Sequence, residues 1–119
     1  MSESLLQWQW GLYRAVHKDR RNLLIHIFTQ PIFVLGALTA VTSPLIGGWR
    51  ALVSGLVAMV VAMALQGRGH GIEKEPPVPF RSRADIFARI FAEQFITFPR
   101  FVLSGAFAEA WRQSKPQSS

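Results

Sequence analysis

Two long apolar segments dominate the hydrophobic pattern of the chain. No residue with a fixed charge occurs in residues 23–49, and a second apolar run covers residues 51–65. The first run exceeds the roughly 20 residues that an α-helix needs to cross a bilayer, whereas the second would reach only about 22 Å of a core about 30 Å thick. Including Trp49 and Gln66, or thinning the bilayer locally, closes most of that gap. The pattern therefore predicts a hairpin of two membrane-spanning helices.

Prolines and glycines indicate where these helices bend or end. Pro31 predicts a kink in the first helix, and Pro44 predicts its end in a turn over residues 43–48. Small residues in the second run, such as Gly55, would allow it to pack closely against the first. Glycine and proline then recur throughout residues 67–80, which predicts a loop rather than a regular helix.

Amphipathic segments flank the predicted hairpin. Residues 5–16 mix leucine, tryptophan and tyrosine with glutamine and arginine, which is typical of a helix at the headgroup level. Ser82 and Asp85 have the spacing of a capping box, and an apolar stripe on the following helix lies opposite three charged residues. The stripe comprises Ile86, Phe87, Ile90, Phe91, Phe95 and Phe98, and the charged residues are Asp85, Arg89 and Glu93.

The C-terminal part completes the predicted architecture. Pro99 is expected to break the amphipathic helix, and residues 101–111 are expected to form one further short helix. The polar residues 113–119 are expected to form a disordered tail. The predicted fold class is therefore all-α, a multi-pass membrane helical bundle with two principal spanning helices and amphipathic interfacial helices at both ends, in one domain over residues 1–112.

The distribution of basic residues predicts an orientation. The chain has 13 lysines and arginines against 7 acidic residues, a net charge of +6. They flank the apolar segments without forming a contiguous basic stripe, so anionic lipid headgroups explain them better than nucleic acid. Four precede the first span and four follow the second, namely Arg14, Lys18, Arg20 and Arg21, and Arg68, Lys74, Arg81 and Arg83, whereas Arg50 alone lies between the spans. The positive-inside rule then places both termini in the cytoplasm.

The predicted hairpin brings the three histidines of the chain to the same end. His17 precedes the first span, His26 lies one turn inside it, and His70 follows the second, with Glu73 three residues further on. Imidazoles with a carboxylate suit non-haem Fe(II), and zinc accepts the same donors. The chain has no cysteine, so a metal must use nitrogen and oxygen ligands. Asn22 lies four residues before His26, as Tyr13 does before His17, so each shares a helix face with a histidine that it could orient.

Structural roles for the same residues are open alternatives. His17 lies next to Lys18 and could face lipid headgroups. The polar ring nitrogens of His26 could be satisfied by a hydrogen bond to another helix. Glu73, Lys74 and Glu75 could form a solvated charge run.

Two segments carry a resemblance to a known family. Residues 13–31 read YRAVHKDRRNLLIHIFTQP, and residues 66–77 read QGRGHGIEKEPP. Both resemble motifs of the membrane 2-hydroxy fatty acid dioxygenase family. The first resembles the family's pattern of a tyrosine, a histidine, N-x-x-x-H and a proline. The second resembles its Q-x-x-G-H motif, which is followed by a glutamate-lysine pair and a proline. The similarity extends over about residues 10–101 in helix organisation.

The resemblance implies an Fe(II)-dependent enzyme of fatty-acid α-oxidation, which uses dioxygen to shorten a 2-hydroxy fatty acid by one carbon. It implies His17, His26 and His70 as metal ligands, and it gives Asn22 and Glu73 a place at the reaction centre. Arg21 or Lys74 is then expected to bind the substrate carboxylate. Four phenylalanines are expected to line the acyl path, namely Phe87, Phe91, Phe95 and Phe98.

Two other classes of protein are compatible with the sequence. One is a non-catalytic accessory subunit of a larger membrane complex or oligomer, in which the histidines are structural or bind a pigment or haem. The other is a soluble helical bundle that binds a lipid. No phosphate-binding loop, serine triad or nucleic-acid module is indicated.

Overall fold

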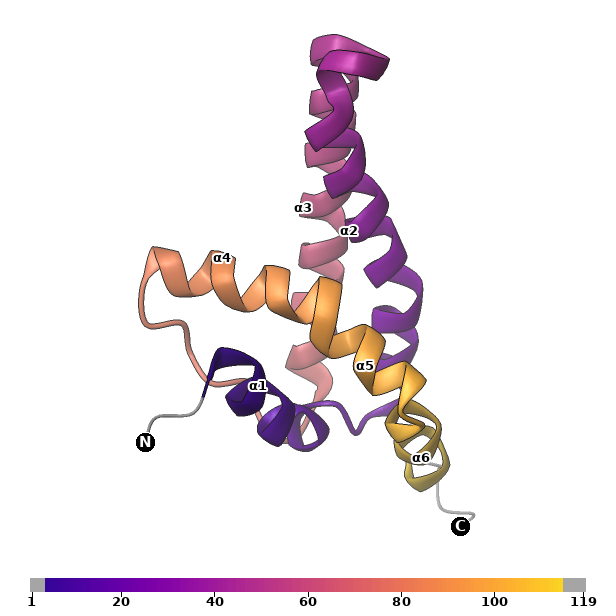
Figure 1. Ribbon diagram of the computed structural model, residues 1–119. Helices are drawn as coiled ribbons and strands as arrows, with labels where there is room; N and C mark the ends of the chain where they lie inside the picture. The colour runs from indigo at the N-terminus through magenta and orange to yellow at the C-terminus, as the bar shows by residue number, and fades with distance from the viewer. Residues whose placement is uncertain (1–3, 115–119) are drawn as a thin grey trace.

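The computed structural model describes residues 4–114, and every secondary-structure element within that range is a helix (Figure 1). The all-helical prediction is therefore confirmed. The elements in chain order are α1 (Leu5–Tyr13), the 3-10 turn η1 (Arg14–Val16), α2 (Arg20–Ile46), α3 (Gly48–Ile72), α4 (Arg83–Ala92), the π-helical segment η2 (Glu93–Thr97), α5 (Phe98–Leu103) and α6 (Ala106–Gln113).

The long helices α2 and α3 form the predicted antiparallel hairpin, which projects beyond the other elements (Figure 1). Gly36 and Gly55 allow the close approach of the two backbones. A Cβ atom at Gly36 would lie 2.7 Å from the Gly55 carbonyl oxygen, and one at Gly55 would collide with the Gly36 carbonyl oxygen. Packing of small residues therefore brings α2 and α3 together.

Both hairpin helices are long and apolar enough to cross a membrane. They contain 27 and 25 residues, which correspond to about 40 and 37 Å at 1.5 Å per residue. Only 28% and 11% of the residues in their most apolar windows are buried, whereas the core helix of a soluble domain is mostly buried. Large apolar side chains project outward from the hairpin, among them Phe28, Val41, Leu45 and Val60. We call this exposed surface the apolar belt.

The ends of the hairpin helices agree with the prediction only in part. The helix α2 ends at Ile46, close to Pro44 as predicted, but both Pro31 and Pro44 lie within it, so the turn is shorter than residues 43–48. The helix α3 continues to Ile72, so residues 67–72 are not part of a loop. Gly69 explains this extension, because a Cβ atom there would collide with the side chain of Asn22 on α2. Close packing outweighs the cost of about 1 kcal/mol for each helical glycine, so α3 extends beyond the apolar run of residues 51–65.

The remaining helices cross the hairpin near its open end (Figure 1). Ser82 caps α4 by accepting from the Asp85 amide, as predicted, but the Asp85 carboxylate accepts from the Arg81 amide instead of completing the predicted capping box at Ser82. Pro99 does not break the helical path, since the chain passes from α4 through the π-helical segment into α5. Proline cannot donate to the carbonyl four residues earlier, and the widened turn before it accommodates the missing bond.

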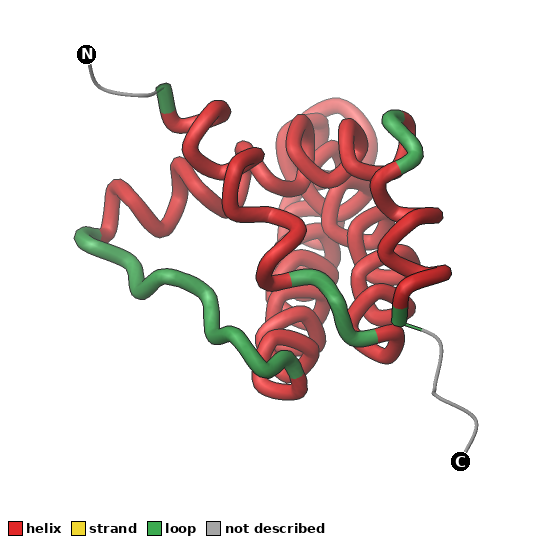
Figure 2. Tube along the Cα trace, turned by 90° about the horizontal axis from the view of Figure 1, so that it is seen from below, coloured by secondary structure: helices red, strands yellow, loops and turns green. Residues whose placement is uncertain are grey.

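Two short helices occupy the region where one was predicted. Gly105 separates α5 from α6 and has a φ angle of +88°, which glycine adopts without strain. The predicted tail is partly helical, because α6 ends at Gln113. Residues 115–119 of that tail lie outside the described residues. Figure 2 views the molecule from below, where the loop of residues 73–82 leads from α3 to α4.

We expect Gly36→Ala to destabilise the hairpin by about 1–3 kcal/mol, because the new methyl group meets a backbone oxygen that cannot move away freely. Gly67→Ala is the matched control. A Cβ atom at Gly67 has nothing within 4 Å, so this variant should be neutral or slightly more stable through helix propensity. SDS-induced unfolding in mild detergent measures both, and equal stability of the two variants would contradict the role of Gly36.

Candidate metal centre

Four side chains from four parts of the chain converge at the open end of the hairpin. His17 follows η1, His26 lies near the start of α2, His70 lies in the last turn of α3, and Glu93 begins the π-helical segment. One ligand atom from each lies within 4.8 Å of those of the other three, so the group could hold a metal ion. We call these residues the His3Glu group. Its formation confirms that histidines distant in sequence become neighbours.

The hydrogen bonds of two histidines determine which ring nitrogen is free. His17 Nδ1 lies 2.8 Å from the Tyr13 carbonyl oxygen, and His26 Nδ1 lies 3.0 Å from the Asn22 carbonyl oxygen. A carbonyl oxygen can only accept, so each Nδ1 carries a proton, and in the neutral form of each ring Nε2 presents a lone pair. Such a bond to a carbonyl is typical of metal-binding histidines.

The free nitrogens of these two rings face each other and a carboxylate. The two Nε2 atoms are 3.4 Å apart, and each lies 3.5 Å from Glu93 Oε2. Three electron-pair donors at such separations repel one another unless a cation lies among them. Nitrogen and oxygen donors of this kind suit Fe(II) or zinc, so the residues fit the metal that the sequence predicted.

His70 completes the group from the opposite helix. Its ring lies edge-on to those of His17 and His26, with centroids 4.7 and 5.0 Å away. Its Nδ1 atom is buried and has no hydrogen-bond partner. Buried polar atoms are seldom left unpaired, and a metal ligand would account for this one.

Tyr13 holds both His17 and Glu93 in place. Its ring stacks on that of His17 with centroids 3.8 Å apart, and its hydroxyl donates to Glu93 Oε2 at 2.7 Å. Its backbone carbonyl accepts from the same histidine. One residue therefore orients an imidazole and a carboxylate of the His3Glu group.

Burial and mutual contact change the ionisation of these residues. Burial lowers the pKa of His17 below its ordinary value despite the nearby Glu93 carboxylate. Burial raises the pKa of Glu93, but its contacts with His17 and His26 outweigh that effect and hold the pKa well below the usual range. Burial, reinforced by Glu93, raises the pKa of Tyr13 well above its usual value. At neutral pH the group therefore offers a neutral imidazole and a carboxylate beside a protonated phenol.

A pair of amide side chains attaches the π-helical segment to the hairpin. Gln94 Nε2 donates to Gln66 Oε1 at 2.7 Å, and Gln66 Nε2 donates back to Gln94 Oε1 at 3.0 Å. Gln66 also donates to the Thr29 hydroxyl, so α2, α3 and the π-helical segment share one buried network. Because Gln94 adjoins Glu93, this network places the carboxylate beside His26.

The structure places Asn22 and Glu73 outside the His3Glu group and bonds them to each other. Glu73 accepts from the backbone amides of Lys18 and Asp19 at 2.9–3.0 Å and from Asn22 Nδ2 at 2.8 Å. These charge-assisted bonds fasten the segment between His17 and His26 to the end of α3. The contacts of Glu73 thus support the ligand-bearing segment.

Arg21 and Lys74 also lie apart from the His3Glu group. They line a surface cavity together with Glu73. Arg21 is exposed and pairs with Asp19, with Nη2 3.0 Å from Oδ2. The structure therefore does not bring either basic residue to the candidate metal ligands.

Glu93 is the member of the group that sequence reasoning missed. On the preceding helix α4, the charged Arg89 is buried whereas Phe87 is 65% exposed, which is the reverse of the orientation that the apolar stripe predicted. A signal was present, because Glu93 is the only acidic residue between Ile86 and Val102, a segment otherwise rich in apolar residues. An isolated acid in such a segment is a candidate functional residue.

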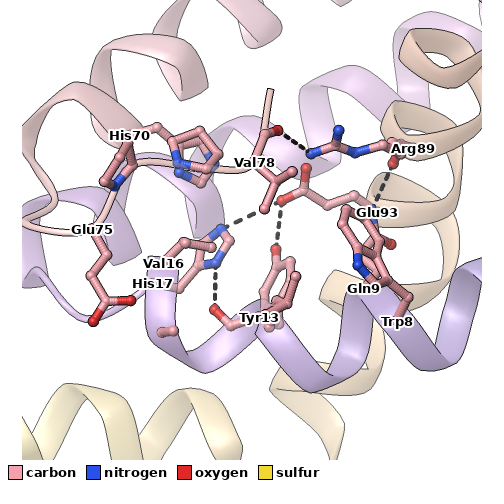
Figure 3. A pocket seen from close by; sticks show the side chains of 14 residues that line it. Trp8, Gln9, Tyr13, Val16, His17, His70, Glu75, Val78, Arg89 and Glu93 are labelled. Carbon is pink, nitrogen blue, oxygen red and sulfur yellow. Dashed lines mark hydrogen bonds and ion pairs between the residues drawn. The ribbon is translucent and has the colours of Figure 1, made fainter. Parts of the chain in front are cut away.

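Two cavities reach the His3Glu group from different sides. The smaller, about 160 Å³, lies between α1 and the loop of residues 73–82 and is bordered by Tyr13, His17 and Glu93 (Figure 3). The larger, about 470 Å³, lies between α3, the same loop and α4. Arg89 holds the loop in place by donating to the carbonyl oxygens of Val78 and Pro79 at 2.6 and 3.1 Å. Both cavities border His70 and Glu93.

No protein-family model, curated protein or solved structure matches this chain. The fold and the site define its class: a helical protein with two helices able to span a membrane and a three-histidine, one-glutamate group at one end of their hairpin.

We expect Glu93→Gln to lose bound metal, because the amide removes the negative charge and the most basic oxygen of the group. Glu73→Gln is the matched contrast. It should retain the metal ligands but lose about 1–3 kcal/mol of stability, since charge-assisted bonds to two amides and Asn22 are weakened. Metal analysis of both purified variants, with SDS-induced unfolding, measures these effects. Full metal content in Glu93→Gln together with metal loss in Glu73→Gln would reverse the assignment.

The metal-free protein should become less stable as the pH falls below about 6.5, the ordinary pKa of histidine. The pKa of His17 is lower in the folded protein, so the unfolded chain takes up the proton first. The contribution of His17 to the free energy of unfolding is therefore fully present above about pH 6.5 and is lost as the pH falls toward the lowered pKa of the folded protein. Unfolding measurements at several pH values after chelation of the metal should show this loss of stability. The pH dependence should be weaker in His17→Gln, and an unchanged pH dependence in that variant would contradict the prediction.

Proposed function

We propose that the protein is a membrane-embedded Fe(II)-dependent dioxygenase that shortens 2-hydroxy fatty acids by one carbon. The observation that carries the proposal is the His3Glu group, in which the Nδ1 atoms of His17 and His26 are bound to carbonyls and their Nε2 atoms face Glu93. Three imidazoles and one carboxylate would hold the iron. The bound metal would supply open coordination positions and the redox chemistry with dioxygen.

The apolar belt supports a position in a bilayer. The hairpin exposes large apolar side chains along its length, and its open end carries charged residues such as Lys18, Arg21 and Lys74. In a membrane this arrangement would put the His3Glu group near the headgroups, with both termini cytoplasmic by the positive-inside rule. A 2-hydroxy fatty acid in the bilayer would also have its carboxylate and 2-hydroxyl near the headgroups.

The chemistry of the substrate is compatible with the group. A 2-hydroxy acid presents a hydroxyl and a carboxylate on adjacent carbons, which together can occupy two open positions on a metal. Overall, the hydroxy acid and dioxygen would yield the acid shorter by one carbon, carbon dioxide and water. Arg21 and Lys74 would attract the anionic substrate to this end of the protein rather than bind it at the reaction centre, because both lie outside the two cavities.

The residues of the chain would mainly provide positioning. Tyr13 holds Glu93 through its hydroxyl and His17 through its carbonyl, so both donors keep their orientation while substrate enters. Glu73 and Asn22 secure the segment between the first two histidines. The buried setting of His17 and His26 limits access of water, which favours controlled chemistry with dioxygen.

The test is to purify the protein in mild detergent, add Fe(II) anaerobically and measure iron, zinc and oxygen uptake with 2-hydroxyhexadecanoate. We expect about one iron per chain and a product shorter by one carbon. His26→Ala and His70→Ala should remove both metal and activity, whereas Glu109→Gln, on α6 and outside both cavities, should change neither.

Other results would redirect the assignment. A folded wild-type protein without metal or oxygen uptake would favour the accessory-subunit interpretation. A protein that binds zinc but takes up no oxygen would argue against an oxygenase while leaving the metal centre in place.

A further inference from the structure

The larger cavity has an unusual wall on α3. Met63, Gly67 and Gly71 follow one another at intervals of four residues and all line the cavity. Residues at this spacing lie on one helix face. A Cβ atom added at Gly67 or Gly71 would meet nothing within 4 Å, so this face is open because two side chains are absent.

The opposite walls are mostly apolar and come from two other elements. Residues 76–80 of the loop contribute three prolines together with Val78 and Phe80, and α4 contributes Ile90. Arg89, which also borders the cavity, directs its guanidinium to the carbonyls of the loop. The other polar side chains of the lining are those of Gln9, Gln66, His70 and Glu93.

The cavity runs from the His3Glu group along α3 toward the apolar belt. Met63 lies seven residues before His70, which corresponds to about 10 Å along the helix axis. The neighbouring Val60 is largely exposed and belongs to the belt. One end of the cavity thus offers metal-binding donors, and the other leads to surface that a bilayer would cover.

We propose that this cavity binds the alkyl chain of a single-chain carboxylic acid, which enters sideways from the lipid with its head at the His3Glu group. The proposal rests on the proposed function for the identity of the head group, but the alkyl site itself requires only the cavity. Gly67 determines whether a long chain fits, and Met63 limits the cavity at the end nearer the hairpin turn.

The smaller cavity does not fit a long chain as well. It is about 160 Å³ against about 470 Å³, and it extends toward Ala15 and Glu75 rather than toward the apolar belt. An alkyl chain placed there would lead to the charged end of the protein. The two cavities therefore differ in direction, and only the larger one extends along the hairpin toward the apolar belt.

The first experiment labels the purified wild-type protein with a palmitic acid analogue that carries a diazirine in its alkyl chain. We expect labelled peptides from residues 63–71 and 78–90. In Gly67→Leu their labelling should fall by about tenfold or more, since each methylene denied burial costs about fourfold in binding. Gly11→Leu is the matched control, because Gly11 on α1 also has nothing within 4 Å and does not line the cavity.

Turnover and metal content separate the proposal from the proposed function. Gly67→Leu should retain full metal, lose conversion of 2-hydroxyhexadecanoate and retain conversion of 2-hydroxybutanoate. Met63→Trp, which closes the cavity from its far end, should reproduce the effect and keeps the test valid if the first variant does not fold.

The outcomes are distinguishable. Labelling of the cavity that Gly67→Leu abolishes, without any turnover in the wild type, would support the alkyl site and reject the dioxygenase. Two results would overturn the alkyl site and leave the dioxygenase standing. One is turnover in the wild type with labelling elsewhere, and the other is turnover in the wild type with both variants fully active on the long acid.

Discussion

The position of His70 beside the other two histidines depends on the close packing of α3 against α2. Backbone contact at Gly36 and Gly55 begins this packing, and Gly69 continues it against Asn22 at the open end. A larger residue at these positions would separate the helices and move His70 away from His26. The glycines therefore act as spacing elements, and the chemistry at the end of the hairpin is a consequence of that spacing.

The second requirement is a polar interior at one end of an otherwise apolar molecule. Buried donors and acceptors are costly unless they find partners, and the amide pair of Gln66 and Gln94 satisfies its own groups while attaching the π-helical segment. The position of Glu93 is a consequence of that attachment, because Glu93 is the neighbour of Gln94 in the chain. Widened helical turns of this kind often occur at functional sites, and here one directs a carboxylate toward His17 and His26.

Sequence reasoning succeeded where local chemistry controls structure. Apolar runs predicted the two long helices, and Ser82 predicted the start of α4. It failed where packing overrides local preference: Pro99 does not interrupt the helical path, and the glycines of residues 67–72 lie in a helix rather than in a loop. Proline and glycine disfavour helices on average, but contacts from another helix change the balance, and those contacts cannot be read from neighbours in the chain.

The sequence by itself determined the helical class, the hairpin and the gathering of His17, His26 and His70, because hydrophobic periodicity and helix length set which ends of the helices meet. Only the tertiary structure decided which carboxylate joins them. Glu73 is near His70 in sequence but is held by backbone amides, whereas Glu93 arrives from a distant helix whose polar face turns inward. Orientation about a helix axis depends on the contacts that the helix makes with other elements, and the residues next to it in the chain do not specify those contacts.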